Sequence, residues 1–302
     1  MDALIPRGPH GGDGSQLAEL LGIDPAAVLD LSASLNPVAP HITDLVARHL
    51  DAIKVYPDPT SAACAVAEMV GVDSDRVVMT NGGAEAIAVV AQLLPSGRVH
   101  PPEFSLYERH LVEVSASGPL WRSNPNNPTG LLADSADFAD VWDEAFYVLA
   151  TGDWTRGDGH SWRLGSLTKA FACPGLRIGF IVVPESHDAA DVRRLVPRWS
   201  LNAIAAAIVP DLVELSEGPE WCSRIDVLRS QLSDLVRQFG LVPEPSDSNF
   251  VVVRDCPGLR DGLARQGVLI RDTTSFGFSG VRIAVPSEAG LERLAAAMAA
   301  TL

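Results

Sequence analysis

The alternation of short apolar segments with helical segments constrains the fold of this chain more than any other feature. Residues 76–80 (RVVMT) are typical of a buried strand, and residues 86–94 are typical of an apolar helix. The glycine-rich turn between them, residues 81–85, would point the free N–H groups of the first helical turn at an anion. Further strands are expected at 28–31, 99–101, 119–123, 138–142, 162–164 and 178–183. Strands that alternate with helices predict a mainly parallel sheet with its loops at one edge.

A length of 302 residues allows a large core and two domains. We expect residues 1–39 to form an arm that packs with the C-terminal part of the chain, and residues 40–214 to form a large α/β domain around the sheet. Residues 215–302 are expected to form a smaller α+β domain. Its helices are expected at about 220–239 and 288–302, and its strands at 249–254, 268–271 and 280–285.

The composition argues against several classes of partner. With a net charge of −15 and a pI of about 4.8, the chain would repel nucleic acid and anionic membranes, so neither is an expected partner. No stretch has the length of a membrane span or the apolar core of a signal peptide. The four cysteines form no metal-binding pattern, and their scatter is typical of reduced thiols in a cytoplasmic protein.

One lysine stands in a setting that suits an aldehyde cofactor with a phosphate tail. Lys169 ends the run Ser166-Leu167-Thr168-Lys169, and Arg177 follows eight residues later. The amine can condense with the aldehyde, while the hydroxyls and the guanidinium hold the phosphate. An isolated lysine is far more often a solvated surface residue, so this interpretation needs further motifs.

Two further segments supply that support: residues 124–130 (NPNNPTG) and residues 143–146 (DEAF). Together, and in this order, the three segments resemble those of fold-type I pyridoxal-phosphate enzymes of the aminotransferase superfamily. The resemblance implies an aspartate-aminotransferase-like fold and pyridoxal 5'-phosphate as the cofactor. It also implies a homodimer in which two subunits share each active site.

The resemblance assigns a role to each candidate cofactor residue. Lys169 would carry the cofactor and act as a base, Asp143 would pair with the pyridinium nitrogen, and Asn127 would hydrogen-bond the phenolic oxygen. Phe104 would stack on the ring, and Phe146 lies beside the phenolic oxygen without a hydroxyl to donate. The phosphate would be held by Gly83, Ala84, Ser166, Thr168, Arg177 and, from a neighbouring subunit, Tyr56.

Further segments narrow the resemblance to one branch of the superfamily. His10-Gly11-Gly12, residues 29–37 (LDLSASLNP), residues 56–58 (YPD), residues 199–202 (WSLN) and residues 268–271 (VLIR) are similar to those of L-threonine-O-3-phosphate decarboxylases of cobalamin synthesis. Histidinol-phosphate aminotransferases share most of the site, but they usually carry Tyr where this chain has Phe146. The implied substrate is a small phosphorylated amino acid, held by His10, Asn36, Arg271 and Arg282.

The reaction itself depends on which bond at the substrate Cα stands perpendicular to the cofactor plane. An upright carboxylate leads to decarboxylation, here to (R)-1-amino-2-propanol phosphate, and an upright hydrogen leads to transamination. The resemblance favours decarboxylation. An aminotransferase acting on histidinol phosphate or another amino acid, and a cofactor-binding protein without catalysis, are the alternatives.

The chain is shorter than the families it resembles usually are. Only twelve residues separate Gly130 from Asp143, where a full helix and a strand are usual. The segment before Asp143, residues 138–142 (FADVW), is a short and polar substitute for a buried strand. We therefore expect a large domain that is trimmed on one face. A partner subunit would cover the gap, or the core would be weakened.

Overall fold

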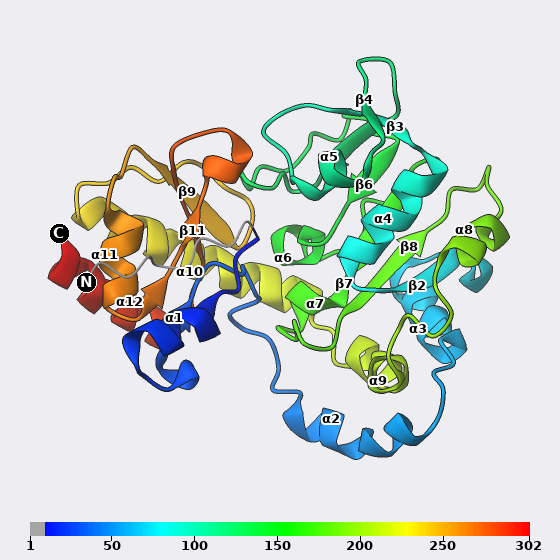
Figure 1. Ribbon diagram of the computed structural model, residues 1–302, viewed down its shortest axis with the longest axis horizontal. Coiled ribbons are helices and arrows are strands. Elements are labelled where there is room, and N and C mark those ends of the chain that lie inside the picture. Colours follow the sequence, from blue (N-terminus) through cyan, green and yellow to red (C-terminus); the bar gives the residue numbers. More distant parts are fainter. Residues whose placement is uncertain (1–9) are drawn as a thin grey trace.

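A seven-stranded sheet brings the predicted motif loops together. In the computed structural model, which describes residues 10–302, the strand order is β2-β8-β7-β6-β5-β3-β4 (Figure 1). Strand β8 is antiparallel to both of its neighbours, β2 and β7, and the other pairs are parallel. The strands are β2 (Val77–Asn81), β3 (Ser96–Val99), β4 (Glu113–Val114), β5 (Leu120–Ser123), β6 (Val141–Asp143), β7 (Trp162–Ser166) and β8 (Ile178–Val182). The predicted α/β class with a mainly parallel sheet is confirmed.

The register of the parallel strands explains why the motifs meet. Ser123 at the end of β5 pairs with Asp143 at the end of β6, and Asp143 pairs with Leu164 on β7. Because the carboxyl ends of parallel strands lie at one edge of a sheet, the loops that follow β5, β6 and β7 begin side by side. The turn after β2 reaches the same edge, since Asn81 pairs with Ile178 at the start of antiparallel β8.

Helices cover both faces of this sheet. Alternate residues of β2 point to opposite faces: Val77 and Met79 pack in one core cluster, and Val78 packs in the other. The first face is covered by α3 (Thr60–Val70), α6 (Tyr147–Thr151), α7 (Leu167–Ala170) and α9 (Ala203–Glu214). The opposite face is covered by α4 (Gly83–Leu93), α5 (Leu106–His110) and α8 (Ala189–Leu195). Helix α2 (Thr43–Arg48) contacts α9.

A second, three-stranded antiparallel sheet lies at the other end of the molecule (Figure 1). Its order is β11 (Arg271–Asp272), β12 (Gly280–Ala284) and β9 (Phe250–Arg254). Helices α11 (Leu259–Arg265) and α12 (Glu288–Thr301) and the second half of α10 (Gly218–Gln238) pack with it. The first half of α10 contributes Trp221 and Ile225 to the core of the large sheet, so this helix belongs to both cores.

The N-terminal segment packs with the C-terminal region. Strand β1 (Leu29–Asp30) pairs in parallel with β10 (Val268–Leu269), and Leu17 of α1 (Gly14–Leu21) is buried against Ala264 and Leu269. The domain boundaries expected after residues 39 and 214 remain predictions, and residues 1–9 of the expected arm lie outside the described part. No helix among residues 10–302 combines the length and the apolar character that crossing a membrane requires.

The trimmed region is closed by the chain's own side chains. Residues 124–140 contain no helix, yet Trp142 on β6 has no exposed surface. The guanidinium groups of Arg122 and Arg156 lie 5.2 Å and 4.4 Å from the centroid of its ring. Arg156 also donates hydrogen bonds to the main-chain oxygens of Asp134, Ser135 and Asp137. The shortened loop is therefore tied down over Trp142 without help from a partner subunit.

Several predicted element boundaries need correction. The strand expected at 138–142 runs instead from Val141 to Asp143, because the segment before it forms a turn in which the main-chain N–H of Asp137 donates to the oxygen of Asp134. The single strand expected at 268–271 is divided into β10 and β11, which belong to different sheets. Helix α4 begins at Gly83, three residues before the predicted start, so the glycine turn forms its first turn.

Candidate active site

The loops at the carboxyl edge of the large sheet surround a cavity of about 360 Å³. Residues of the small sheet and of the N-terminal arm line it as well, so the cavity lies where the large sheet, the small sheet and the arm meet. The predicted site residues that line it are His10, Gly83, Ala84, Phe104, Asn127, Asp143, Phe146, Ser166, Thr168, Lys169, Arg177, Arg271 and Arg282.

Lys169 lies on the short helix α7, which Ser166 caps by accepting the main-chain N–H of Thr168. Its Nζ donates a hydrogen bond of 2.7 Å to the main-chain oxygen of Ala33. Burial, reinforced by the nearby charges of Arg282 and Arg271, lowers the pKa of Lys169 to about 7. A large share of this amine is therefore neutral near pH 7, which is the form that attacks a carbonyl carbon.

The turn before α4 forms an anion-binding end of the cavity. Gly82 has a φ of +77°, and a Cβ at this position would overlap the guanidinium of Arg177. The main-chain N–H groups at the start of α4 are oriented toward the cavity edge. The hydroxyls of Ser166 and Thr168 both lie 3.3 Å from the main-chain oxygen of Ile178. Main-chain N–H groups, two hydroxyls and a guanidinium form a donor set suited to a phosphate.

Asp143 lies at the end of β6, on the floor of the cavity. Its Oδ1 accepts the main-chain N–H of Ala145 at 3.1 Å, and its Oδ2 accepts the hydroxyl of Tyr107 at 2.9 Å. Burial raises the pKa of Asp143. Among residues 10–302 no cation lies within ion-pair distance of this carboxylate, so it can pair with a positive group of a ligand.

Two buried arginines face the cavity from the small sheet. Arg271 on β11 and Arg282 on β12 are directly paired residues of neighbouring strands. Arg282 donates to Asn127 Oδ1 at 2.5 Å, which leaves the amide N–H₂ of Asn127 as the end available to a ligand. Burial lowers the pKa of Arg271 to about 10, so its guanidinium stays charged at neutral pH.

The arm closes one side of the cavity. Arg271 donates to the main-chain oxygen of His10 at 3.1 Å. The imidazole of His10 is exposed and meets the ring of Phe104 edge-on, with centroids 5.9 Å apart. Burial of part of the ring, followed by the charges of Arg271 and Arg109, lowers the pKa of His10.

Two predicted site residues do not line the cavity. Tyr56 is 76% exposed and stacks on Trp199, with ring centroids 4.4 Å apart. Asn36 is buried and donates its amide to the main-chain oxygen of Ala170, while its own main-chain N–H donates to the oxygen of Lys169. Asn36 therefore supports the segment that carries the lysine from behind, instead of facing the cavity.

Sequence reasoning missed Tyr107, Ser123 and Glu103. Ser123 lines the cavity, and Tyr107 and Glu103 are buried behind it. A buried carboxyl and a buried tyrosine are detectable only once the chain is folded, although Phe104 and Tyr107 do have the three-residue spacing of one helical face.

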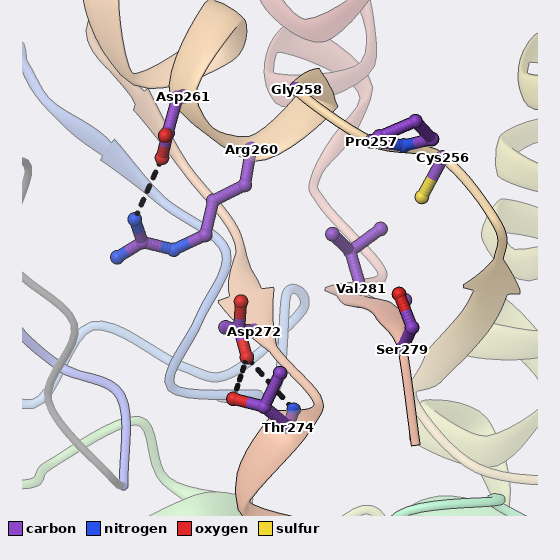
Figure 2. A pocket seen from close by; sticks show the side chains of 10 residues that line it. Cys256, Pro257, Gly258, Arg260, Asp261, Asp272, Thr274, Ser279 and Val281 are labelled. Atoms are coloured by element: carbon purple, nitrogen blue, oxygen red, sulfur yellow. Dashed lines mark hydrogen bonds and ion pairs between the residues drawn. The ribbon is translucent and has the colours of Figure 1, made fainter.

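A second, smaller cavity of about 90 Å³ lies in the C-terminal region, between α11, β12 and the segment after β11 (Figure 2). Figure 2 shows Arg260 paired with Asp261, and Asp272 accepting hydrogen bonds from Thr274. Cys256 lines this cavity too, and burial raises the pKa of its thiol, which makes it a poor nucleophile. None of the predicted site residues lines this second cavity.

Comparisons with known proteins agree with this geometry. The family described as aminotransferase class I and II matches residues 103–298, well over half of the chain. The threonine-phosphate decarboxylase of Salmonella typhimurium is 28% identical over 96% of this chain and 95% of its own length. Histidinol-phosphate aminotransferase 1 of Mesorhizobium japonicum is 25% identical over 92% of this chain and 91% of its own.

Solved structures share the fold. The histidinol-phosphate aminotransferase of Sinorhizobium meliloti, solved in complex with pyridoxal-5'-phosphate, aligns with a TM-score of 0.80 at 18% identity. The alignment covers 98% of this chain and 94% of that one. The chain belongs to the aminotransferase class I and II family, and it is an enzyme that uses pyridoxal phosphate, a lyase or a transaminase. The family, enzyme class and cofactor expected from the sequence are confirmed.

The residues of the cavity fit this cofactor. The donors beside α4 can bind a phosphate, and the neutral form of Lys169 can react with an aldehyde. The carboxylate of Asp143, which has no cation within ion-pair distance among residues 10–302, can bind a ring nitrogen that carries a proton. A Cβ at Gly179 would overlap the main chain of Gly82 and Gly83, so glycine at this position keeps the anion-binding turn against the sheet.

Proposed function

We propose that this enzyme decarboxylates L-threonine O-3-phosphate to (R)-1-amino-2-propanol phosphate, for the side chain made in cobalamin synthesis. The observation that carries the proposal is the pair of buried arginines, Arg271 and Arg282, which face the same cavity as Lys169. The proposed substrate has two anionic groups, a carboxylate and a phosphate, and each arginine can bind one of them. The similarity to the Salmonella typhimurium decarboxylase over nearly the whole chain supports the same choice.

The proposed roles follow the geometry of the cavity. Pyridoxal phosphate, when bound, supplies an electron sink for the bond that breaks at the substrate Cα. Lys169 would hold the cofactor and, once freed by the substrate, would supply the proton that takes the place of the departing carbon dioxide at Cα. Asp143 would keep the ring nitrogen protonated. Arg282 binds the carboxylate of the substrate, while Arg271 and His10 bind its phosphate. The neighbouring strands β11 and β12 hold the two arginines at a fixed separation.

A separate set of residues is proposed to bind the cofactor. Its phosphate would be held by the N–H groups of Gly83 and Ala84, the hydroxyls of Ser166 and Thr168, and the guanidinium of Arg177. Asn127 donates its amide to the phenolic oxygen, and Phe104 covers the ring.

Phe146 supports a decarboxylase over an aminotransferase. Its ring lies 5.4 Å from the ring of Phe250 and 5.8 Å from Lys169 Nζ, and it has no hydroxyl to donate. Asn127 is therefore proposed as the protein's donor to the phenolic oxygen at this position, which changes the electron distribution of the bound cofactor.

We also propose a cytoplasmic homodimer with shared active sites. Ile53 and Val55 are both 66% exposed, and Tyr56 stacks on the exposed Trp199 beside them. Apolar and aromatic side chains gathered in this way are suited to an interface. In the dimer Tyr56 would reach the phosphate of the cofactor bound by the neighbouring subunit.

A second candidate is an aminotransferase that acts on histidinol phosphate or another amino acid. The observation that favours it is the 25% identity to the Mesorhizobium japonicum aminotransferase over 92% of this chain. An aminotransferase would use the same lysine, the same phosphate-binding groups and the same two arginines.

The deciding experiment compares the two reactions in one preparation. The holoenzyme is incubated with L-threonine O-3-phosphate without any oxo acid, and released carbon dioxide is measured. A second incubation contains histidinol phosphate and 2-oxoglutarate, and amino transfer is measured. Carbon dioxide released without an acceptor, and abolished by Lys169→Ala, supports the decarboxylase. Amino transfer without carbon dioxide release would refute it in favour of the aminotransferase.

A further inference from the structure

A buried tyrosine joins Asp143 to the core behind the cavity. The hydroxyl of Tyr107 donates to Asp143 Oδ2, and the Tyr107 side chain is fully buried. Burial, followed by the charges of Asp143 and Glu103, raises the pKa of Tyr107 well above its ordinary value. The hydroxyl therefore keeps its proton and acts as the donor in this bond.

Glu103 is a second buried carboxyl near Tyr107, and its charge contributes to the raised pKa of Tyr107. Its carboxyl accepts the main-chain N–H of Ser123 at 3.1 Å and also accepts the Ser123 hydroxyl. Burial raises the pKa of Glu103 to about 8. Glu103 is therefore satisfied by Ser123, and the Tyr107 hydroxyl is left to Asp143.

The two buried carboxyls have separate hydroxyl donors: Tyr107 donates to Asp143, and Ser123 donates to Glu103. A donor onto a carboxylate favours its ionised form, which opposes the effect of burial on Asp143.

We propose that Tyr107 is the positioning residue for Asp143: its buried hydroxyl keeps the carboxylate ionised and turned toward the ring nitrogen of the cofactor. The main-chain N–H of Ala145 holds only the other oxygen of the carboxylate. The Tyr107 ring also meets Phe104 edge-on at 5.9 Å, so the same residue supports the side chain that faces the ring.

The test uses the holoenzyme loaded with pyridoxal phosphate that carries ¹⁵N in the ring. Tyr107→Phe removes the hydroxyl and keeps the buried ring, and Tyr147→Phe, on α6 outside the cavity lining, is the matched control. For Tyr107→Phe we expect cofactor affinity to fall about tenfold and the ¹⁵N resonance to move toward that of an unprotonated pyridine. Tyr147→Phe should change neither. If the Tyr107→Phe resonance stays where it is in the wild type, whatever the affinity, the proposal is overturned.

A second replacement keeps the proposal testable if Tyr107→Phe does not fold. 4-Fluorophenylalanine in place of Tyr107 fills the space of the hydroxyl but has no proton to donate, so the ¹⁵N resonance should move in the same direction as in Tyr107→Phe. The same replacement of Tyr147 is the control and should leave the resonance unchanged. A resonance that keeps its wild-type position when 4-fluorophenylalanine replaces Tyr107 would refute the proposal.

Discussion

Replacement of Lys169 by methionine should stabilise the apoprotein, and the gain should depend on pH. The chain has only two lysines, Lys54 and Lys169. In the folded protein the pKa of Lys169 is lowered from 10.5 to about 7, chiefly by burial. Between these two pH values the unfolded chain binds a proton that the folded chain does not. The free energy of unfolding therefore falls as the pH drops from 10.5 to 7, and Lys169 destabilises the fold by a constant amount below pH 7.

The magnitude follows from the size of the shift. Each pKa unit corresponds to about 1.4 kcal/mol, so a change from 10.5 to about 7 gives an upper bound of about 5 kcal/mol. Because the amine borders a cavity that water can enter, we reduce this to roughly 2 kcal/mol. Lys169→Met should thus be more stable than the wild type by roughly 2 kcal/mol at pH 6, and by much less near pH 10.

Urea denaturation of the apoproteins at pH 6, 7, 8, 9 and 10 measures this difference. Lys54→Met is the matched control, because Lys54 is exposed and pairs with Asp51 on the surface. That variant should follow the wild type at each pH. A stability gain for Lys169→Met that is constant across this range would show that the effect is ordinary packing, and the inference of a neutral amine near pH 7 would be wrong.

Three further outcomes are expected. Arg156→Ala should uncover Trp142 and release its loop, costing about 2 kcal/mol and roughly 3 °C in Tm by calorimetry, and an unchanged Tm would mean that the loop does not close this face. Gly82→Ala should weaken cofactor binding at least about tenfold in a fluorescence titration, because the new methyl group displaces Arg177, and wild-type affinity would contradict this. Arg282→Ala should lower kcat/KM for the phosphorylated substrate at least about thirtyfold, and a smaller loss would show that Arg282 does not bind the substrate carboxylate.

The sequence was sufficient to predict which motifs meet, because parallel strands bring their carboxyl ends to one edge. Asn127, Asp143 and Lys169 each follow a separate strand, and β5, β6 and β7 are neighbours in the sheet. Local pattern and the direction of the strands carry this information, and both can be read along the chain. The pairing of Arg271 with Arg282 was not predicted, because it depends on the register between β11 and β12.

The remaining features arise from contacts between distant segments. Tyr107 and Asp143 are 36 residues apart, and only the packing of α5 on the sheet brings the hydroxyl to the carboxylate. Asn36 carries a motif of the resembled family, but its amide is used by Ala170 behind the cavity. The cover over Trp142 depends on Arg122 from β5 and Arg156 from the loop before β7, a combination that no local pattern predicts.

The proposed substrate has two anionic groups, and the acidic chain would bind it through positive charges that are fixed by burial at the site. Arg271 and Arg282 lie side by side on paired strands, and Arg282 is held further by Asn127 and the main-chain oxygen of Ser32. Because Arg271 also binds the main-chain oxygen of His10, the group proposed to bind the substrate phosphate also secures the arm that closes the cavity. In the proposed complex, a substrate held at both ends by these groups would not rotate freely about Cα. The position of the two arginines relative to the cofactor would then set which bond stands upright, and with it the choice between decarboxylation and transamination.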